Sequence, residues 1–100
     1  MLDRDAVEKA LLIGIVREKN WQILILENIT KEFFTIANHK LYDYIKGYVD
    51  TDKYPDLPVL SYEFDIDDES IMSYNEAGEL SSLCEALRNA YIKEQTEYQI

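Results

Sequence analysis

The chain has 100 residues, of which 47% are hydrophobic and 30% are charged, and its twenty acidic and ten basic residues give a formal net charge of −10. This length and composition predict one globular domain spanning residues 1–100 and exclude a largely disordered chain. The excess of carboxylates disfavours direct binding to nucleic acid, because the phosphate backbone carries charge of the same sign.

A single Cys and a single His set further limits. They exclude an internal disulfide and a four-ligand Cys/His metal site, and they fit a reducing, cytoplasmic environment. We expect no signal peptide, because charged residues between Asp3 and Glu8 interrupt any apolar segment at the start. We expect no membrane contact either, since the longest apolar run, from Ala10 to Val16, is too short to cross a bilayer.

Helix signals begin at the first residues. Asp5, with Glu8 three residues later, matches a capping box that opens a helix ending near Arg17. This helix is apolar around most of its circumference, which predicts either a central place in the domain or a face covered by a second protomer. The residues in excess of one core face are Leu12, Ile13 and Val16.

The next segments are also expected to be helical. The segment from Trp21 to Ile29 fits both strand and helix spacing, and we choose helix because no second strand is available to pair with it. Thr30 and Thr35 are candidate N-caps, the latter for a helix from Ile36 to Val49. The apolar stripe expected on that helix comprises Leu41, Tyr44, Ile45, Tyr48 and Val49.

A linker ending at Pro55 leads to a short helix that Asp56 caps and that carries Pro58 in its first turn. An acidic connector from Ile66 to Asn75 follows, with a single helical turn inside it. The last helix runs from Glu76 to Tyr98. Its stripe contains Ala77, Leu80, Cys84, Leu87, Tyr91, Glu94 and Tyr98. The predicted fold is therefore all-α, a compact bundle of five to seven helices with a long C-terminal helix.

Two groups of residues could support catalysis or metal binding, but a structural role explains each of them better. His39 and Cys84 could form a nucleophile–base pair, but Cys84 lies on an apolar stripe, where a free Cys packs as a small hydrophobic residue. Acidic residues at Asp65, Asp67, Glu69 and Glu76 match ligand positions of a Ca²⁺-binding loop.

The calcium match fails at Ser70, because the sharp turn of such a loop requires glycine there, and the carboxylates are expected to cap helices instead. The sequence also lacks a glycine-rich phosphate loop. We therefore predict no catalytic residue, no cofactor and no metal, and we do not expect the chain to be an enzyme.

Three short patterns in the first half of the chain share their residue types with a known family. They comprise Glu8, Leu11, Leu12 and Gly14, then Glu32, Phe33 and Phe34, and then His39, Tyr42 and Ile45. Together they resemble the N-terminal domain of DnaB-type replicative DNA helicases, over most of residues 5–92. The spacing after His39 departs by one residue from the commoner bacterial form, which is typical of a divergent phage or plasmid member.

The resemblance implies a non-catalytic protein-interaction domain that takes part in assembling the helicase collar and binds primase or a helicase loader in DNA replication. It also implies self-association, as a dimer or within a ring, and it leaves any ATPase motor outside this chain. Residues in excess of one core predict a contact surface on the first and last helices. They are Leu12, Ile13, Val16, Leu87, Tyr91 and Tyr98.

Two alternatives remain open. A helicase-binding domain of a primase has a similar helical core, and a domain at the end of its parent protein would favour it. A stand-alone acidic regulator, of the kind that phages use, would bind a basic protein partner through its charge.

Overall fold

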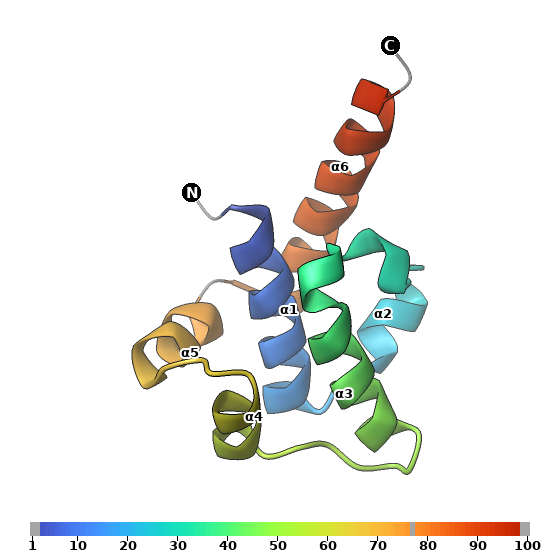
Figure 1. Ribbon diagram of the computed structural model, residues 1–100. Coiled ribbons are helices and arrows are strands. Elements are labelled where there is room, and N and C mark those ends of the chain that lie inside the picture. Colours follow the sequence, from blue (N-terminus) through green and yellow to red (C-terminus); the bar gives the residue numbers. More distant parts are fainter. Residues whose placement is uncertain (1–2, 77, 99–100) are drawn as a thin grey trace.

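The computed structural model describes residues 3–76 and 78–98, and within them the chain forms six α-helices, two short 3-10 helices and no strand. In order, they are α1 (Arg4–Glu18), α2 (Gln22–Leu26), η1 (Lys31–Phe33), η2 (Ile36–Asn38), α3 (His39–Val49), α4 (Leu57–Glu63), α5 (Asp68–Asn75) and α6 (Leu80–Tyr98) (Figure 1). This confirms the predicted all-α bundle with a long C-terminal helix.

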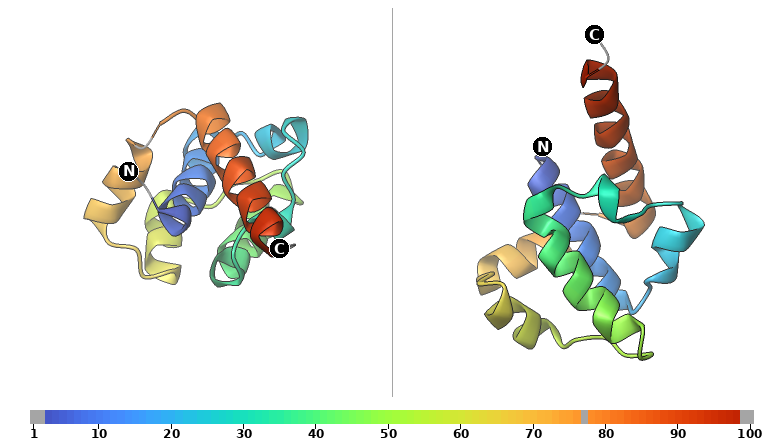
Figure 2. Two further views of the ribbon diagram at one scale, coloured as in Figure 1. Left: turned by 90° about the horizontal axis from the view of Figure 1, so that it is seen from above. Right: turned by 45° about the vertical axis from the view of Figure 1, so that its right-hand side comes forward.

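Helix α1 lies at the centre of the bundle. It contacts α3, α4, α5 and α6, and these helices surround it on different sides when the molecule is seen from above (Figure 2). Every residue from Ala10 to Val16 is buried. Of the two predictions for this helix, the central place is therefore correct, because the chain's own helices cover its whole apolar circumference.

The cap of α1 differs from the prediction. Asp3 stands at the N-cap and accepts a hydrogen bond from the backbone N–H of Ala6 at 2.8 Å. Asp5 lies in the first turn and accepts a hydrogen bond from Lys9 Nζ at 2.6 Å. The predicted capping box is wrong because Glu8 turns into the core, where it meets residues from later in the chain.

Two left-handed residues divide the segment that follows α1. Lys19 (φ 53°) ends α1 two residues after the predicted end near Arg17, and Asn28 (φ 55°) follows the end of α2. The choice of helix between Trp21 and Ile29 is correct, although only Gln22–Leu26 is α-helical. Left-handed backbone at these positions stops helix propagation and lets the chain reverse.

Helix α3 begins later than predicted and presents a different face to the core. Its start is preceded by η2, and Thr30 and Thr35 occupy the N-cap positions of η1 and η2 without a side-chain cap. Tyr42 is buried between the rings of Trp21 and Phe34, with centroid distances of 5.1 and 5.4 Å. This aromatic packing rotates the buried stripe to Leu41, Tyr42 and Ile45, and leaves Tyr44 and Tyr48 half-buried.

The acidic connector holds more structure than the single predicted turn. Helix α4 carries Pro58 in its first turn as expected, but the side chain of Asp56 makes no capping hydrogen bond. Asp65 adopts a left-handed conformation (φ 52°) that turns the chain from α4 towards α5. Asp67 then caps α5 by accepting a hydrogen bond from the backbone N–H of Ser70 at 2.7 Å.

Helix α6 crosses α1 and projects beyond the rest of the bundle at its C-terminal end (Figures 1 and 2). It starts at Leu80, later than the predicted Glu76, and the stripe position Ala77 lies outside the described residues. The crossing is close at Gly14, where a Cβ atom would lie 2.7 Å from Leu80 Cδ2. A larger residue at this position of α1 would therefore require the Leu80 side chain to shift.

Candidate functional site

Four of the six residues predicted as a contact surface lie in the core. Leu12, Ile13 and Leu87 have no exposed surface, and only 4% of Val16 is exposed. They were assigned to a surface because α1 carries more apolar residues than one core face needs, but α5 and α6 cover the excess. These side chains stabilise the fold, and in this conformation a partner cannot reach Leu12, Ile13 or Leu87.

The two tyrosines of the predicted surface have different outcomes. Tyr91 is partly buried, and its ring centroid lies 4.4 Å from that of Phe33. It therefore holds η1 against α6 while keeping some exposed surface. The side chain of Tyr98 lies outside the described residues.

Glu8, Phe34 and His39 lie at a junction between α1 and the start of α3. Glu8 is fully buried, and its Oε1 atom accepts hydrogen bonds from the backbone N–H of Thr35 at 2.7 Å and from Asn38 Nδ2 at 3.0 Å. Phe34 packs in the core next to Thr35, and the carbonyl oxygen of Phe34 lies 2.9 Å from His39 Nε2. One buried carboxylate thus organises the loop that leads into α3.

Arg4 completes this junction and extends it to α6. Its Nε atom donates a hydrogen bond to Glu8 Oε2 at 3.1 Å, and one of its terminal nitrogens donates to the carbonyl oxygen of Phe33 at 2.9 Å. It also forms an ion pair with Glu94 of α6. Since each oxygen of the Glu8 carboxylate has a donor, the group is suited to holding structure and not to transferring protons.

His39 and Cys84 serve the fold in the same way. His39 Nε2–H donates to the Phe34 carbonyl, which fixes the first turn of α3. Cys84 is fully buried on α6, and this burial raises the pKa of its thiol to about 11. At neutral pH the thiol is protonated, so it is a poor nucleophile.

The carboxylates that match a calcium loop are distributed along a helix. Asp67 caps α5, and Glu69 lies in its first turn. Because α5 runs through the middle of the proposed loop, the chain cannot wrap around an ion there. Among the described residues, no group of three metal-ligating side chains comes together.

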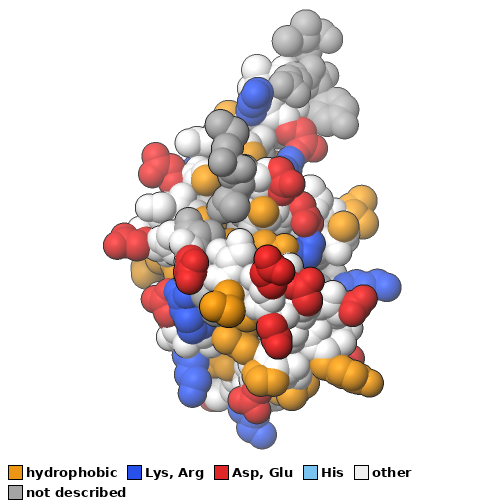
Figure 3. Space-filling model, turned by 90° about the vertical axis from the view of Figure 1, so that its left-hand side faces the viewer, with side chains coloured by type: hydrophobic (Ala, Val, Ile, Leu, Met, Phe, Trp, Pro, Cys, Tyr) orange, Lys and Arg blue, Asp and Glu red, His pale blue; other side chains and the backbone are white. Residues whose placement is uncertain are grey.

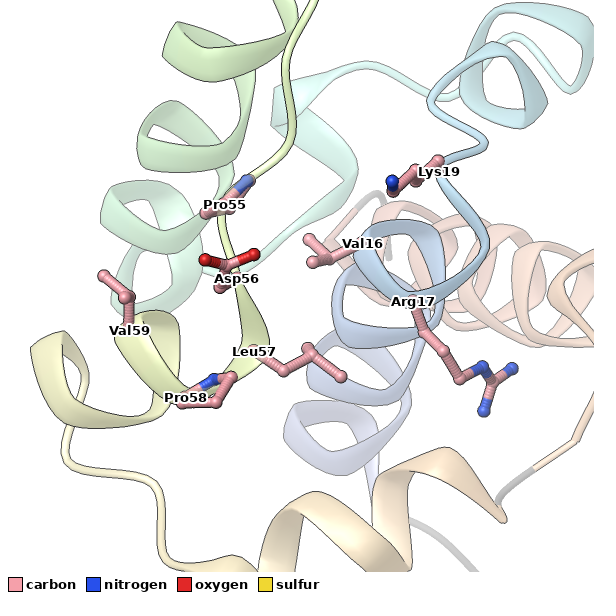
Figure 4. A pocket seen from close by; sticks show the side chains of 8 residues that line it. All are labelled: Val16, Arg17, Lys19, Pro55, Asp56, Leu57, Pro58 and Val59. Carbon is pink, nitrogen blue, oxygen red and sulfur yellow. The ribbon is translucent and has the colours of Figure 1, made fainter.

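A cleft of about 480 Å³ lies between the C-terminal end of α1 and the start of α4 (Figure 4). Val16 and Leu57 point into it from the two helices, while Lys19 and Asp56 bring opposite charges to its rim (Figure 4). A second cleft, of about 470 Å³, lies between α2 and α3 beside the exposed Ile25. Neither cleft contains a histidine or a cysteine, and both are shaped to pack apolar side chains.

The acidic residues are concentrated in one part of the chain. Between Lys53 and Arg88 the sequence has nine Asp or Glu residues and no Lys or Arg, so this segment carries almost all of the net charge of −10. All nine carboxylates are exposed. They are Asp56, Glu63, Asp65, Asp67, Asp68, Glu69, Glu76, Glu79 and Glu85. The ion pairs found among the described residues all use carboxylates from outside this segment.

Sequence reasoning missed the exposed apolar residues within this acidic segment. Val59, Tyr62 and Met72 are exposed on α4 and α5, yet none was predicted as a contact residue. The available signal was the stretch between Lys53 and Arg88, which has no basic residue and includes Val59, Tyr62 and Met72.

No protein-family model, curated protein or solved structure matches this chain. None of the helices in residues 3–76 and 78–98 has the length and hydropathy that crossing a membrane requires.

Proposed function

We propose that this chain is a non-catalytic protein-interaction domain of a replicative DNA helicase, similar to the N-terminal domain of DnaB-type helicases. In this proposal it takes part in assembling the helicase collar and binds primase or a helicase loader in DNA replication. The sequence contains no phosphate-binding loop, so the ATPase motor would be formed by residues outside this chain.

The Glu8 junction is the observation that supports this proposal. The residues of the family-like pattern lie far apart in sequence, yet Glu8, Phe34 and His39 are joined through Thr35 and the Phe34 carbonyl. Burying a carboxylate is costly unless each of its oxygens finds a donor. Glu8 anchors the loop that lies between two other residues of the pattern, Phe34 and His39, and this supports the proposal more strongly than apolar spacing alone.

The direct test is a calorimetric titration of the 100-residue chain with the C-terminal, helicase-binding fragment of a primase from the same replication system. We expect saturable binding without nucleotide, because no ATP site is needed. The matched control replaces that fragment with an unrelated helical protein of the same net charge, which should not bind. Absence of primase binding, together with a natural gene that encodes no P-loop beyond this domain, would refute the proposal.

One observation favours a second candidate function. The concentration of negative charge between Lys53 and Arg88 suits an acidic regulator that occupies a basic protein surface. The same titration distinguishes the two candidates, because a helicase domain should bind the primase fragment, whereas a regulator of this kind binds its own basic target and is not part of a helicase. A primase domain would instead bind the N-terminal domain of a helicase in a parallel titration.

A further inference from the structure

Exposed apolar side chains lie among the carboxylates of α4 and α5. On α4, Val59 and Tyr62 are three residues apart and therefore share a helix face, with Glu63 four residues after Val59. On α5, Met72 shares its face with both Asp68 and Glu69 for the same reason. We call these six residues, Val59, Tyr62, Glu63, Asp68, Glu69 and Met72, the α4–α5 face.

The apolar members of the α4–α5 face are highly exposed. Tyr62 is 86% exposed and Met72 is 62% exposed. The side of the molecule on which α4 and α5 lie shows acidic side chains around hydrophobic ones in its central part (Figure 3). Exposed Tyr and Met side chains rimmed by charge are typical of surfaces that bind other proteins.

We propose that the α4–α5 face is the docking site for a basic, amphipathic helix of a partner protein. This inference rests on the proposed function, since it names the surface and the partner chemistry of a protein-interaction domain. Lys or Arg side chains of the partner would pair with Glu63, Asp68 and Glu69. Its apolar side chains would cover Tyr62 and Met72.

Charge determines the chemistry of the partner. The segment between Lys53 and Arg88 has no basic residue, and none of its carboxylates has an ion-pair partner within the described residues. Nucleic acids and anionic lipid headgroups carry the wrong sign and are repelled. A Lys- or Arg-rich protein segment is attracted, and an Arg side chain over the open ring of Tyr62 adds a cation–π contact.

The shape of the face determines the form of the partner. Within the described residues there is no strand, so a partner cannot add itself to a sheet edge and must bind through side chains. A cleft of about 130 Å³ between α4 and α5 lies beside this face and shares Asp68 with it. It is lined by Leu57, Pro58 and Ile71 and is close to the size of one aliphatic side chain. An amphipathic helix supplies such an anchor with basic residues on the turns next to it.

The test uses the whole 100-residue chain and a synthetic helical peptide of about 20 residues, with Leu on one face and Lys and Arg on the other, labelled for fluorescence anisotropy. A peptide of the same length with Glu in place of the basic residues is the control ligand. We expect the basic peptide to bind, with affinity that falls steeply as salt is raised, and the acidic peptide not to bind.

Paired variants separate this face from general charge attraction. Glu63→Gln/Glu69→Gln and Glu32→Gln/Asp52→Asn each remove two exposed negative charges, so their net charges are equal. We expect the first pair to weaken peptide binding about tenfold and the second to change it less than about twofold. Likewise, Tyr62→Ala should weaken binding about tenfold, whereas Leu26→Ala, at an exposed site on α2, should leave it unchanged.

Chemical-shift mapping of the backbone amides locates the bound peptide directly. Shifts concentrated in residues 57–72 would support the proposal. Three results would overturn it: no binding of the basic peptide, equal weakening by both double variants, or shifts centred on the cleft between α2 and α3. A primase fragment that binds elsewhere would refute this docking site and leave the proposed function intact. Peptide binding at this face without primase binding would support this docking site and count against the proposed function.

Discussion

Glu8 shows how one polar residue can hold distant parts of a chain together. Its carboxylate is fully buried and receives hydrogen bonds from Arg4, Thr35 and Asn38. The sequence pattern assigned Glu8 to a local capping box, because an acid three residues after Asp5 fits that motif. Besides Arg4, its partners are 27 and 30 residues away, and local spacing cannot reveal such contacts.

Replacing Glu8 with Ala should lower the free energy of unfolding by about 3–5 kcal/mol, because the backbone N–H of Thr35 would lose its acceptor and Arg4 and Asn38 would each lose one of theirs. This is a large part of the roughly 5–15 kcal/mol that stabilises a typical domain. Urea denaturation followed by circular dichroism measures the change. Glu32→Ala, at an exposed acid of the same family-like pattern, is the control and should stay within about 0.5 kcal/mol of wild type. A Glu8→Ala value close to that of the control would contradict the role given to this junction.

At the scale of elements, the presence of helices was predictable, whereas their boundaries were less predictable. The 3.6-residue periodicity correctly indicated helices for α3 and α6, and cap and proline signals led to the predictions of α1 and α4. The starts of α3 and α6 were placed too early, because a 3-10 turn before His39 and Gly78 before Leu80 delay them. The residue at which a helix starts depends on how its first turn packs against the neighbouring helices.

The two helical glycines should respond in opposite ways to the same substitution. A Cβ atom added at Gly47 on α3 would meet no other atom within 4 Å, so Gly47→Ala should stabilise the domain by about 0.5–1 kcal/mol through helix propensity. Gly14→Ala should lose this gain and destabilise by about 1 kcal/mol, because its Cβ would lie 2.7 Å from Leu80 Cδ2.

Thermal and urea unfolding of both variants measures this difference, and Leu80→Ala provides the partner for a double-mutant cycle with Gly14→Ala. We expect the Gly14→Ala substitution to be less harmful when Leu80 is already shortened. Equal stabilisation by both glycine substitutions would show that α6 moves away from α1 without cost.

At the scale of the whole molecule, α6 is the element best placed for contact with a second copy. Its buried residues Leu80, Leu83, Cys84 and Leu87 are all in its first half, and its second half projects from the bundle (Figure 1). Ile92 is exposed there beside the partly buried Tyr91. The surplus on α1 that first indicated self-association is buried, so the projecting part of α6 now carries that proposal.

We expect Ile92→Asp to weaken self-association at least about tenfold, because a charge would enter an apolar contact. Sedimentation equilibrium over a wide concentration range measures it. Ile36→Asp, at an exposed residue of η2, introduces the same change elsewhere and should leave association as in wild type. Circular dichroism checks that both variants are folded. A wild type that stays monomeric at the highest concentration would remove self-association from the proposed function.

The sequence alone determined the helical class of this protein, the packing role of Cys84 and the acidic character of its surface, and it limited α1 to a central place or a covered face. These features follow from periodicity, composition and charge, which are local or additive properties of the chain. Only the tertiary structure decided that Leu12, Ile13, Val16 and Leu87 are core, that Glu8 joins α1 to α3, and that Tyr62 and Met72 are exposed among carboxylates. The exposure of a side chain and the identity of its hydrogen-bond partners depend on which elements pack together. Contacts between residues distant in the sequence set this packing, so it is a property of the whole chain.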